Sequence, residues 1–530
     1  MNRREMLKAS GIGIIGAGTL GAVDGFGMGK PAPKETGISE KKPPNARMKN
    51  IIIIKSDQLR WDFLGCMGSK IVKTPNIDKL AEDGFVLEKE FTVSTLCVPS
   101  RTSFFTGKYV HRTANTSNAK DEHIQPGEWS FVEPLKRMGY KIGIAGKNHA
   151  FSDEYFDKFF DYREETSSHG KIFGRISRSD KKVRKYLLHD PRDKYEKSNN
   201  MLGGLIPGPM PFPKEQCPAY RVGEDGVRFV EEHKDNRFFM YYSFADPHWP
   251  QVVPEPYYSM YDPDEMNLEA YPMDWDGHPF KHFVQSRALG FAKYSKKELQ
   301  RILATYCGQV SFVDASVGML IDKLKELGLY EDTVIVFTAD HGDFGGRYGI
   351  IEKTGAFYEP LLRIPGVIKL PGIKGGKRID AQISNIDVMP TIFDYLNISY
   401  PSDVQGISFL PVLKGERQGH RDVIFSEVGQ PNMPPEPVAR DKYDKYNAGK
   451  IKRDGPFWFC DFTTRGRMVM IRKDGWKYCY YVGDTNELYN VADDPYEVNN
   501  LVDEPKYAAK KQELKNELME WLLTEPVKGI

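Results

Sequence analysis

The segment with the most evident chemistry runs from Cys97 to Gly107 and reads Cys-Val-Pro-Ser-Arg-Thr-Ser-Phe-Phe-Thr-Gly. Pro99 is well suited to the first turn of a helix, so we expect a helix to begin there. The free amides and the positive dipole end of a helix N-terminus favour an anion. Taken alone, a cysteine before proline and arginine is more often a buried thiol than a nucleophile. Other parts of the chain must decide between these two interpretations.

Polar side chains suited to a metal ion or an oxyanion follow four apolar segments: Asp57-Gln58, Lys147 with His149, Asp246 with His248, and Asp340-His341. Carboxylate and amide oxygens are hard ligands that suit Ca²⁺ or Mg²⁺, whereas a histidine nitrogen shifts the preference toward Mn²⁺ or Zn²⁺. A single aspartate after a strand is more often a helix cap or a loop residue. Asp57 and Asp340 together, at two strand ends, indicate a metal cage.

Short apolar runs alternating with helical patterns must position these groups. Strands are expected at Ile51–Ile54, Lys141–Ala145, Phe238–Phe244 and Thr333–Thr338, and Ile51–Ile54 has the unbroken β-branched pattern of a strand buried on both faces. Helices are expected from Thr74-Pro75 and over Ser311–Leu327. This alternation predicts a doubly wound α/β sheet, in which ligands collect at the carboxyl ends of the strands.

The chain changes character from about Tyr400 onward. Pro- and Gly-rich loops, short strands at Val423–Glu427 and Trp476–Tyr481, and a final helix near Lys506–Leu523 predict a smaller α+β subdomain with a short antiparallel sheet. We therefore expect a catalytic domain over residues 50–400 and a C-terminal subdomain over residues 401–530.

The segment from Cys97 to Gly107 resembles the signature of the formylglycine-dependent sulfatases. Other segments typical of that family are Gly146-Lys147-Asn148-His149, Ala245-Asp246-Pro247-His248-Trp249-Pro250, Glu352-Lys353 and, near the C-terminus, Glu487-Leu488-Tyr489-Asn490. The resemblance extends from about Asn50 to Asp503. It implies an alkaline phosphatase-like fold with a mixed sheet flanked by helices.

The resemblance also implies a role for each residue of the site. Cys97 would be oxidised to formylglycine by a formylglycine-generating or anaerobic sulfatase-maturating enzyme, and the hydrated aldehyde would supply the nucleophile. The remaining roles are these: Arg101 would hold the nucleophile in place, Lys147 and Lys353 would bind sulfate oxygens, His149 would take the diol proton, His248 would assist the leaving alcohol, and Asp57, Gln58, Asp340 and His341 would hold the metal together with residue 97.

Two positions depart from the usual family pattern. Gln58 stands where most members have a second acidic residue, and His341 stands where many have asparagine. We expect Ca²⁺, with Mg²⁺ or Mn²⁺ as alternatives, because a nitrogen ligand makes the site softer.

The expected function is hydrolysis of sulfate esters on sulfated carbohydrates, with Trp249, Arg465 and Arg467 as candidate sugar contacts. A phosphodiesterase or phosphonate monoester hydrolase of the same superfamily is the first alternative, because the four metal ligands do not separate the two chemistries. An inactive protein that binds sulfated glycans, with Cys97 left as a thiol, is the second.

Bulk properties leave the choice of ligand to the local site. The 530 residues include 74 basic and 73 acidic side chains, a formal net charge of +1, which gives no argument for a nucleic-acid partner. The stretch 171–197 is rich in Lys and Arg and is either a solvated insertion or a guide for a polyanion. The six cysteines show neither a zinc pattern nor a disulfide framework.

The N-terminus predicts export. Arg3 and Arg4 precede a weakly apolar run, which is typical of a twin-arginine signal over residues 1–28, and residues 29–49 are rich in Pro, Lys and Glu like a linker. The apolar run is shorter than the roughly 20 residues of a membrane span, so no stable span is expected. The protein is therefore expected in the periplasm or outside the cell.

Overall fold

The computed structural model describes residues 49–118, 122–165, 208–210, 213–249, 251–289, 294–429 and 466–524. All of these residues belong to one compact unit. The predicted export signal, most of the predicted linker, the basic stretch 171–197, and Pro250, Cys460 and Arg465 lie outside the described residues.

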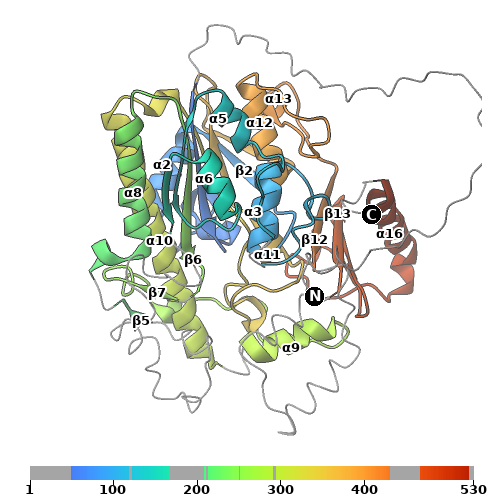
Figure 1. The fold of residues 1–530 in the computed structure, drawn as a ribbon. Coiled ribbons are helices and arrows are strands. Elements are labelled where there is room, and N and C mark those ends of the chain that lie inside the picture. Colours follow the sequence, from blue (N-terminus) through green and yellow to red (C-terminus); the bar gives the residue numbers. More distant parts are fainter. Residues whose placement is uncertain are drawn as a thin grey trace, which may run out of the picture. The chain divides into compact units, whose positions relative to one another are not determined.

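A large mixed sheet forms the centre of this unit (Figure 1). The order of its main strands is β11-β2-β10-β8-β1-β6-β3-β4, and β9 pairs with β2. The strands are β1 Asn50–Asp57, β2 Phe85–Phe91, β3 Lys141–Gly146, β4 Tyr162–Glu165, β6 Phe238–Pro247, β8 Thr333–Ala339, β9 Arg363–Ile364, β10 Gly366–Lys369 and β11 Lys377–Ser384. Neighbouring strands from β8 through β1, β6 and β3 to β4 are parallel, whereas β10 is antiparallel to both β8 and β2.

Helices cover both faces of this sheet, and the apolar sequence of β1 gives the reason. Its four isoleucines are fully buried, with Ile52 and Ile54 packed into one core cluster and Ile51 and Ile53 into the other. Successive strand side chains point to opposite faces, so an unbroken apolar run fits only a sheet covered on both sides. The predicted α/β fold class is thereby confirmed.

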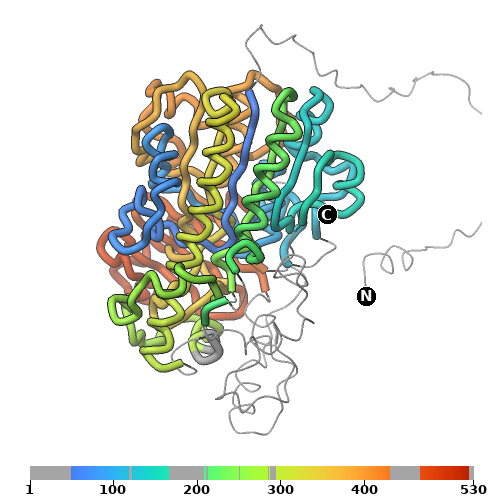
Figure 2. The backbone as a smooth tube through the Cα atoms, turned by 90° about the vertical axis from the view of Figure 1, so that its left-hand side faces the viewer, coloured from blue at the N-terminus to red at the C-terminus, as the bar shows by residue number. Residues whose placement is uncertain are grey.

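The layer with Ile52 and Ile54 contains α2 (Pro75–Asp83), α8 (Pro218–His233) and α10 (Lys296–Glu326). Figure 2 faces this layer and shows α8 and α10, in green and yellow, side by side over the sheet. The layer on the other face contains α3 Cys97–Thr106, α5 Val132–Arg137, α6 Asp153–Phe159, α12 Val388–Tyr395 and α13 Leu410–Leu413 (Figure 1).

Two predicted helix starts were too late. The helix predicted over Ser311–Leu327 begins at Lys296, where Ser295 and Glu298 form a reciprocal capping box. The helix expected from Pro99 begins at Cys97, so Pro99 is its third residue. Cys97 therefore lies in the first turn itself, where backbone amides lack helical partners.

A smaller antiparallel sheet of the order β12-β13-β14-β15 follows the central sheet in the sequence. Its strands are β12 Val423–Val428, β13 Met468–Lys473, β14 Trp476–Tyr481 and β15 Glu487–Asn490. Helix α16 (Ala508–Thr524) packs Leu514, Leu518 and Trp521 against it. The short antiparallel sheet and terminal helix were predicted; whether residue 400 is a domain boundary stays a prediction.

The remaining elements are short. They are α4 Val110–Thr113, α9 Phe280–Leu289, α11 Glu359–Leu362, strands β5 Gly208–Pro209 and β7 Val252–Val253, and 3-10 turns at Trp61–Phe63, Gly65–Met67, Lys214–Gln216, Pro263–Glu265, Tyr330–Asp332, Arg347–Gly349, Asn385–Asp387 and Pro505–Tyr507. Among the described residues, no helix has the length and apolar character needed to cross a membrane.

A buried ion pair holds the segment after β11 in place. Arg421 donates two hydrogen bonds to the fully buried Asp387 carboxylate, at 2.7 and 2.5 Å, and His420 Nε2 lies 3.0 Å from it. Burial alone would raise the pKa of Asp387, but Arg421 and His420 lower it to about 2. This pairing therefore stabilises the fold above the ordinary pKa of aspartate, and the contribution is lost as the pH falls toward 2.

We predict that Arg421→Ala lowers the free energy of unfolding by about 3–5 kcal/mol, because it leaves a buried carboxylate without its cation. The acid unfolding transition should also move to higher pH. Urea unfolding across a pH series measures both effects. Arg137→Ala, which removes an exposed pair with Glu133, is the control and should cost less than about 1 kcal/mol. An Arg421→Ala protein as stable as this control would contradict the prediction.

Candidate active site

The four polar segments predicted to follow strands lie at the same edge of the sheet, because β3, β6, β1 and β8 are adjacent and parallel. Asp57 ends β1, Lys147 follows β3, His248 follows β6, and Asp340 follows β8. The carboxyl ends of adjacent parallel strands meet at one edge, as expected for the ligand-binding side of such a sheet.

Two glycines permit close contacts at these strand ends. A Cβ on Gly146, whose φ is +103°, would lie 1.8 Å from the carbonyl oxygen of Ser243. A Cβ on Gly342 would lie 1.8 Å from the carbonyl oxygen of Pro360. Any other residue at either position would displace the neighbouring backbone, and with it Lys147 or His341.

Arg101 is the central cation of the site and is fully buried. Its Nη2 donates to Asp57 Oδ2 at 2.8 Å, and its Nε donates to Asp340 Oδ2 at 2.8 Å. Its Nη1 donates to Tyr241 Oη at 2.5 Å and to Ser243 Oγ at 2.7 Å. Arg101 therefore connects the ends of β1 and β8 to helix α3. Its role of holding the nucleophile in place stays a prediction.

Cys97 lies at the N-terminus of α3 and is 2% exposed. Its Sγ is 2.8 Å from Lys353 Nζ, 3.4 Å from His341 Nε2, 3.8 Å from Lys147 Nζ and 3.9 Å from Asp57 Oδ1. Segments distant in the sequence thus converge on one sulfur atom. The predicted catalytic lysines both reach it.

The charges around Cys97 determine its protonation. Burial and the Asp57 carboxylate disfavour the thiolate, but Lys147, Lys353 and His341 outweigh them and lower the pKa of the Cys97 thiol to about 7. Burial also disfavours the charged form of Asp57, yet Lys147, Lys353 and Arg101 hold its pKa well below the usual range. The site is therefore electropositive enough to keep an anion at residue 97.

The predicted metal ligands form one buried group. Ligand atoms of Asp57, Cys97, Asp340 and His341 all lie within 4.8 Å of one another. His341 Nδ1 is 2.9 Å from the carbonyl oxygen of Gly342, to which it donates when it carries the ring proton, and this leaves Nε2 as the ligating nitrogen.

Gln58 provides an independent test of whether a metal fits. Its side-chain Oε1 is buried and has no hydrogen-bond partner among the described residues. A buried oxygen without a partner is costly, and a cation held beside Asp57 would supply one. The donor set of carboxylates, an amide oxygen and an imidazole nitrogen therefore fits a divalent cation.

The two predicted catalytic histidines have different surroundings. His248 Nε2 lies 4.0 Å from Asp57 Oδ1, and its Nδ1 is 2.8 Å from the carbonyl oxygen of Trp249. Burial, Lys353 and Lys147 hold the pKa of His248 well below the usual range. His149 is half-buried at the end of β3, and the ring contact described for it is with His123, at 6.1 Å between centroids. Its role stays a prediction.

Several residues of the site were missed by the sequence analysis. Tyr241 and Ser243 hold Arg101, Asn385 Nδ2 donates to Ser100 Oγ at 3.1 Å, and Asp343 accepts from the Gln58 side chain at 2.5 Å. Tyr241 and Ser243 carried one available signal, because they bear hydroxyl groups and, being two apart on a strand, share a face.

The candidate sugar contacts are partly engaged within the protein. Arg467 Nη2 donates to Glu427 Oε2 at 3.2 Å, and Trp249 packs against the core on the α10 side. Arg465 lies outside the described residues. These assignments stay predictions.

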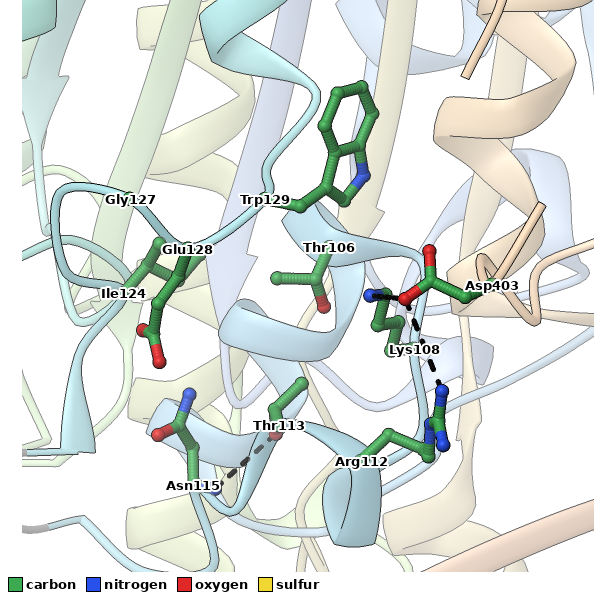
Figure 3. A pocket seen from close by; sticks show the side chains of 10 residues that line it. All are labelled: Thr106, Lys108, Arg112, Thr113, Asn115, Ile124, Gly127, Glu128, Trp129 and Asp403. Carbon is green, nitrogen blue, oxygen red and sulfur yellow. Dashed lines mark hydrogen bonds and ion pairs between the residues drawn. The ribbon is translucent and has the colours of Figure 1, made fainter. Parts of the chain in front are cut away.

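A separate cavity of about 320 Å³ lies at the other end of α3, near Thr106 and Trp129 (Figure 3). Lys108 Nζ is 2.5 Å and Arg112 Nη2 is 4.0 Å from the same carboxylate oxygen of Asp403, so these opposite charges are paired within the cavity wall. None of the residues around Cys97 lines this cavity.

The comparisons with known proteins agree with this geometry. The sulfatase family model matches residues 49–398, so the chain belongs to the sulfatase family. The match confirms the resemblance noted in the sequence and makes the protein an enzyme of the sulfuric ester hydrolase class.

The similar proteins include named sulfatases, and the solved structures that share the fold include phosphonate monoester hydrolases. The multifunctional alkaline phosphatase superfamily protein PehA of Trinickia caryophylli is 26% identical over 520 residues, which cover 90% of this chain and 95% of that protein. N-acetylglucosamine-6-O-sulfatase of Bacteroides thetaiotaomicron is 26% identical, with 88% of this chain and 84% of that protein covered. The structure of phosphonate monoester hydrolase from Silicibacter pomeroyi has a TM-score of 0.72 at 23% identity and covers 91% of this chain and 96% of that one; it shares the fold.

We predict that Cys97 is the one cysteine of the described residues that forms a thiolate near pH 7, in metal-free protein in which it has not been modified. Burial raises the pKa values of Cys66, Cys217 and Cys307 to about 12 and that of Cys479 well above its usual range, so these four thiols stay protonated there. The ultraviolet absorbance of thiolates against pH measures this step, and Cys97→Ser should remove it. Lys353→Ala should shift it upward, because a cation 2.8 Å from the sulfur is lost. A first thiolate appearing only above pH 9 would contradict the prediction.

Proposed function

We propose that this protein hydrolyses sulfate esters of carbohydrates, using a formylglycine made from Cys97 and a divalent cation. The observation that carries the proposal is the environment of Cys97 Sγ. Two lysine ammonium groups and an imidazole surround this atom at the N-terminus of a ten-residue helix, beside a buried carboxylate pair. Such a place favours a tetrahedral anion next to residue 97.

A sulfate ester is an anion and reacts only slowly with water as the nucleophile. The hydrated formylglycine would supply a hydroxyl group that attacks the sulfur atom in place of water. Lys147 and Lys353 face that position and would offset the charge that develops on the sulfate oxygens. His149 is proposed to take a proton from the hydrated aldehyde. Arg101 would keep α3, and therefore residue 97, fixed against Asp57 and Asp340.

His248 is proposed to donate a proton to the leaving sugar oxygen. With its Nδ1 turned to the carbonyl of Trp249, the proton that His248 exchanges is the one on Nε2. Burial, Lys353 and Lys147 hold the pKa of His248 well below the usual range in the free site, so the negative charge of a bound sulfate ester is needed to favour the protonated imidazole.

The cation would be held by Asp57, Gln58, Asp340, His341 and the modified residue 97, and it would polarise a sulfate oxygen. Two carboxylates and an amide oxygen support Ca²⁺, with Mg²⁺ or Mn²⁺ as alternatives because His341 adds a nitrogen.

A carbohydrate substrate and export to the periplasm or the outside of the cell are further parts of the proposal. The similarity to N-acetylglucosamine-6-O-sulfatase supports the sugar, and the paired arginines Arg3 and Arg4 support export. A formylglycine-generating or anaerobic sulfatase-maturating enzyme would be an obligatory partner, because Cys97 must be oxidised.

A second candidate is hydrolysis of phosphonate monoesters or phosphodiesters. The similarity to the structure of phosphonate monoester hydrolase supports it. These substrates are also singly charged tetrahedral esters, so the same lysines and cation would bind them. The predicted export signal and the pair of Lys147 and His149 favour sulfate.

We predict that matured protein releases inorganic sulfate from members of a panel of sulfated mono- and oligosaccharides, and that Cys97→Ala abolishes release. Ion chromatography of the product measures it. The same preparation is assayed in parallel on phosphonate monoesters and phosphodiesters. Turnover confined to those esters would overturn the sulfate proposal in favour of the second candidate, and hydrolysis retained by Cys97→Ala would contradict the assigned nucleophile.

Removal of the cation should abolish turnover, because its removal leaves the sulfate oxygens and residue 97 without their strongest positive charge. Matured protein is treated with a chelator and dialysed, and Ca²⁺, Mg²⁺ or Mn²⁺ is then added separately while sulfate release is followed. We expect Ca²⁺ to restore the rate. Full activity in protein shown by elemental analysis to be metal-free would contradict the metal site.

A further inference from the structure

Gln58 is held on three sides. Its backbone N–H donates to Asp340 Oδ1 at 3.0 Å, and its carbonyl oxygen accepts from Tyr306 Oη at 2.7 Å. Its side-chain Nε2 donates to Asp343 Oδ2 at 2.5 Å. The backbone has a left-handed φ of +63°, so the whole residue is locked at the end of β1.

Asp343 is itself fixed. It is 2% exposed, and its Oδ1 accepts from the backbone N–H of Gly345 at 2.6 Å. It does not belong to the group of metal-ligand candidates formed by Asp57, Cys97, Asp340 and His341. Asp343 therefore contacts Gln58 and is not itself a candidate metal ligand.

An amide has two different ends, unlike a carboxylate. Both oxygens of Asp343 act as acceptors, Oδ1 toward the Gly345 N–H and Oδ2 toward Gln58, so Gln58 faces Asp343 with Nε2. The reverse orientation would set two acceptors against each other. The amide nitrogen Nε2 has no lone pair available to bind a cation. Only the observed orientation therefore directs a possible metal ligand away from Asp343. That ligand is Oε1, which is buried and has no hydrogen-bond partner among the described residues.

We propose that Asp343 is a positioning residue that sets the amide orientation of Gln58, so that Oε1 is the atom offered to the divalent cation. This role rests on the proposed function, because it needs a cation at Asp57, Asp340 and His341. It also explains how a glutamine can be a metal ligand at position 58. A carboxylate there could bind the cation with either oxygen and would need no residue to orient it.

Asp343→Asn tests the role directly. In this variant the remaining side-chain oxygen of residue 343 still accepts from the Gly345 N–H. The new amide nitrogen then faces Gln58 Nε2, so that two hydrogen-bond donors face each other. Gln58 relieves this by turning its amide, which moves Oε1 away from the cation. We expect the dissociation constants for Ca²⁺ and Mn²⁺ to rise about tenfold or more, in line with other losses of a residue that orients a metal ligand.

The double variant Gln58→Glu with Asp343→Asn should restore binding. The carboxylate introduced at position 58 can accept from the amide nitrogen introduced at position 343 with one oxygen and offer the other oxygen to the cation. Gln58→Glu alone places a carboxylate against the carboxylate of Asp343, which is unfavourable. We expect the double variant to bind about tenfold more tightly than Gln58→Glu, by the same reasoning about ligand orientation. This comparison remains informative if Asp343→Asn alone folds poorly.

Isothermal titration calorimetry of chelator-treated protein measures the affinities without any assay of turnover. Asp314→Asn is the matched control, because Asp314 is also buried and accepts from a side-chain amide, that of Asn76, at 2.8 Å on the α2–α10 side. This control should bind the cations as the wild type does. Thermal unfolding of each metal-free variant reports damage to the fold itself.

Two outcomes would overturn the role: an Asp343→Asn protein that binds both cations as tightly as the wild type, or a double variant no better than Gln58→Glu. A wild-type protein that binds no divalent cation would overturn the proposed function and this role together. The two failures are therefore distinguishable in one set of titrations.

Discussion

The site depends on the Arg101 guanidinium, a buried cation that is bound to both of the buried carboxylates, Asp57 and Asp340. Without it, Asp57 and Asp340 would be neighbouring like charges in a medium of low dielectric, an arrangement that proteins avoid. With it, the ends of β1 and β8 and the signature helix α3 form one rigid unit. Burial raises the pKa of Asp340, but Arg101 outweighs it and lowers that pKa below its usual range.

This constraint explains how a protein with almost no net charge can present a strongly charged site. Three cations, Arg101, Lys147 and Lys353, face the two carboxylates of Asp57 and Asp340. The lysines come from the ends of other segments and meet at Cys97 Sγ. The excess of positive charge is local to this group of side chains, so it favours an anionic group there.

The sequence predicted the elements whose signals are local. The run Ile51–Ile54 identified a strand buried on both faces, and the polar residues after four strands identified the edge where the site forms. The convergence of Lys353 on Cys97 came from family resemblance, because nothing in the local pattern near residue 353 indicates a partner more than 250 positions away.

What the sequence did not reveal depends on contacts between distant segments. Tyr241, Asn385 and Asp343 became visible only once the strands and loops were placed beside Arg101, Ser100 and Gln58. Strand β10 has four residues and lies between β2 and β8, antiparallel to both. An alternation of strands and helices in the sequence predicts parallel neighbours and does not predict this strand. The start of α10 is an exception, because its capping box at Ser295 is a local signal that the sequence does contain.

The most direct test of this account compares turnover with the extent of modification at Cys97. Preparations made with graded amounts of maturation enzyme are analysed by mass spectrometry of the peptide that carries residue 97, and each is assayed for sulfate release. The account predicts a rate that rises in proportion to the formylglycine fraction and extrapolates to zero when all of residue 97 is cysteine. A rate that does not depend on this fraction would contradict it.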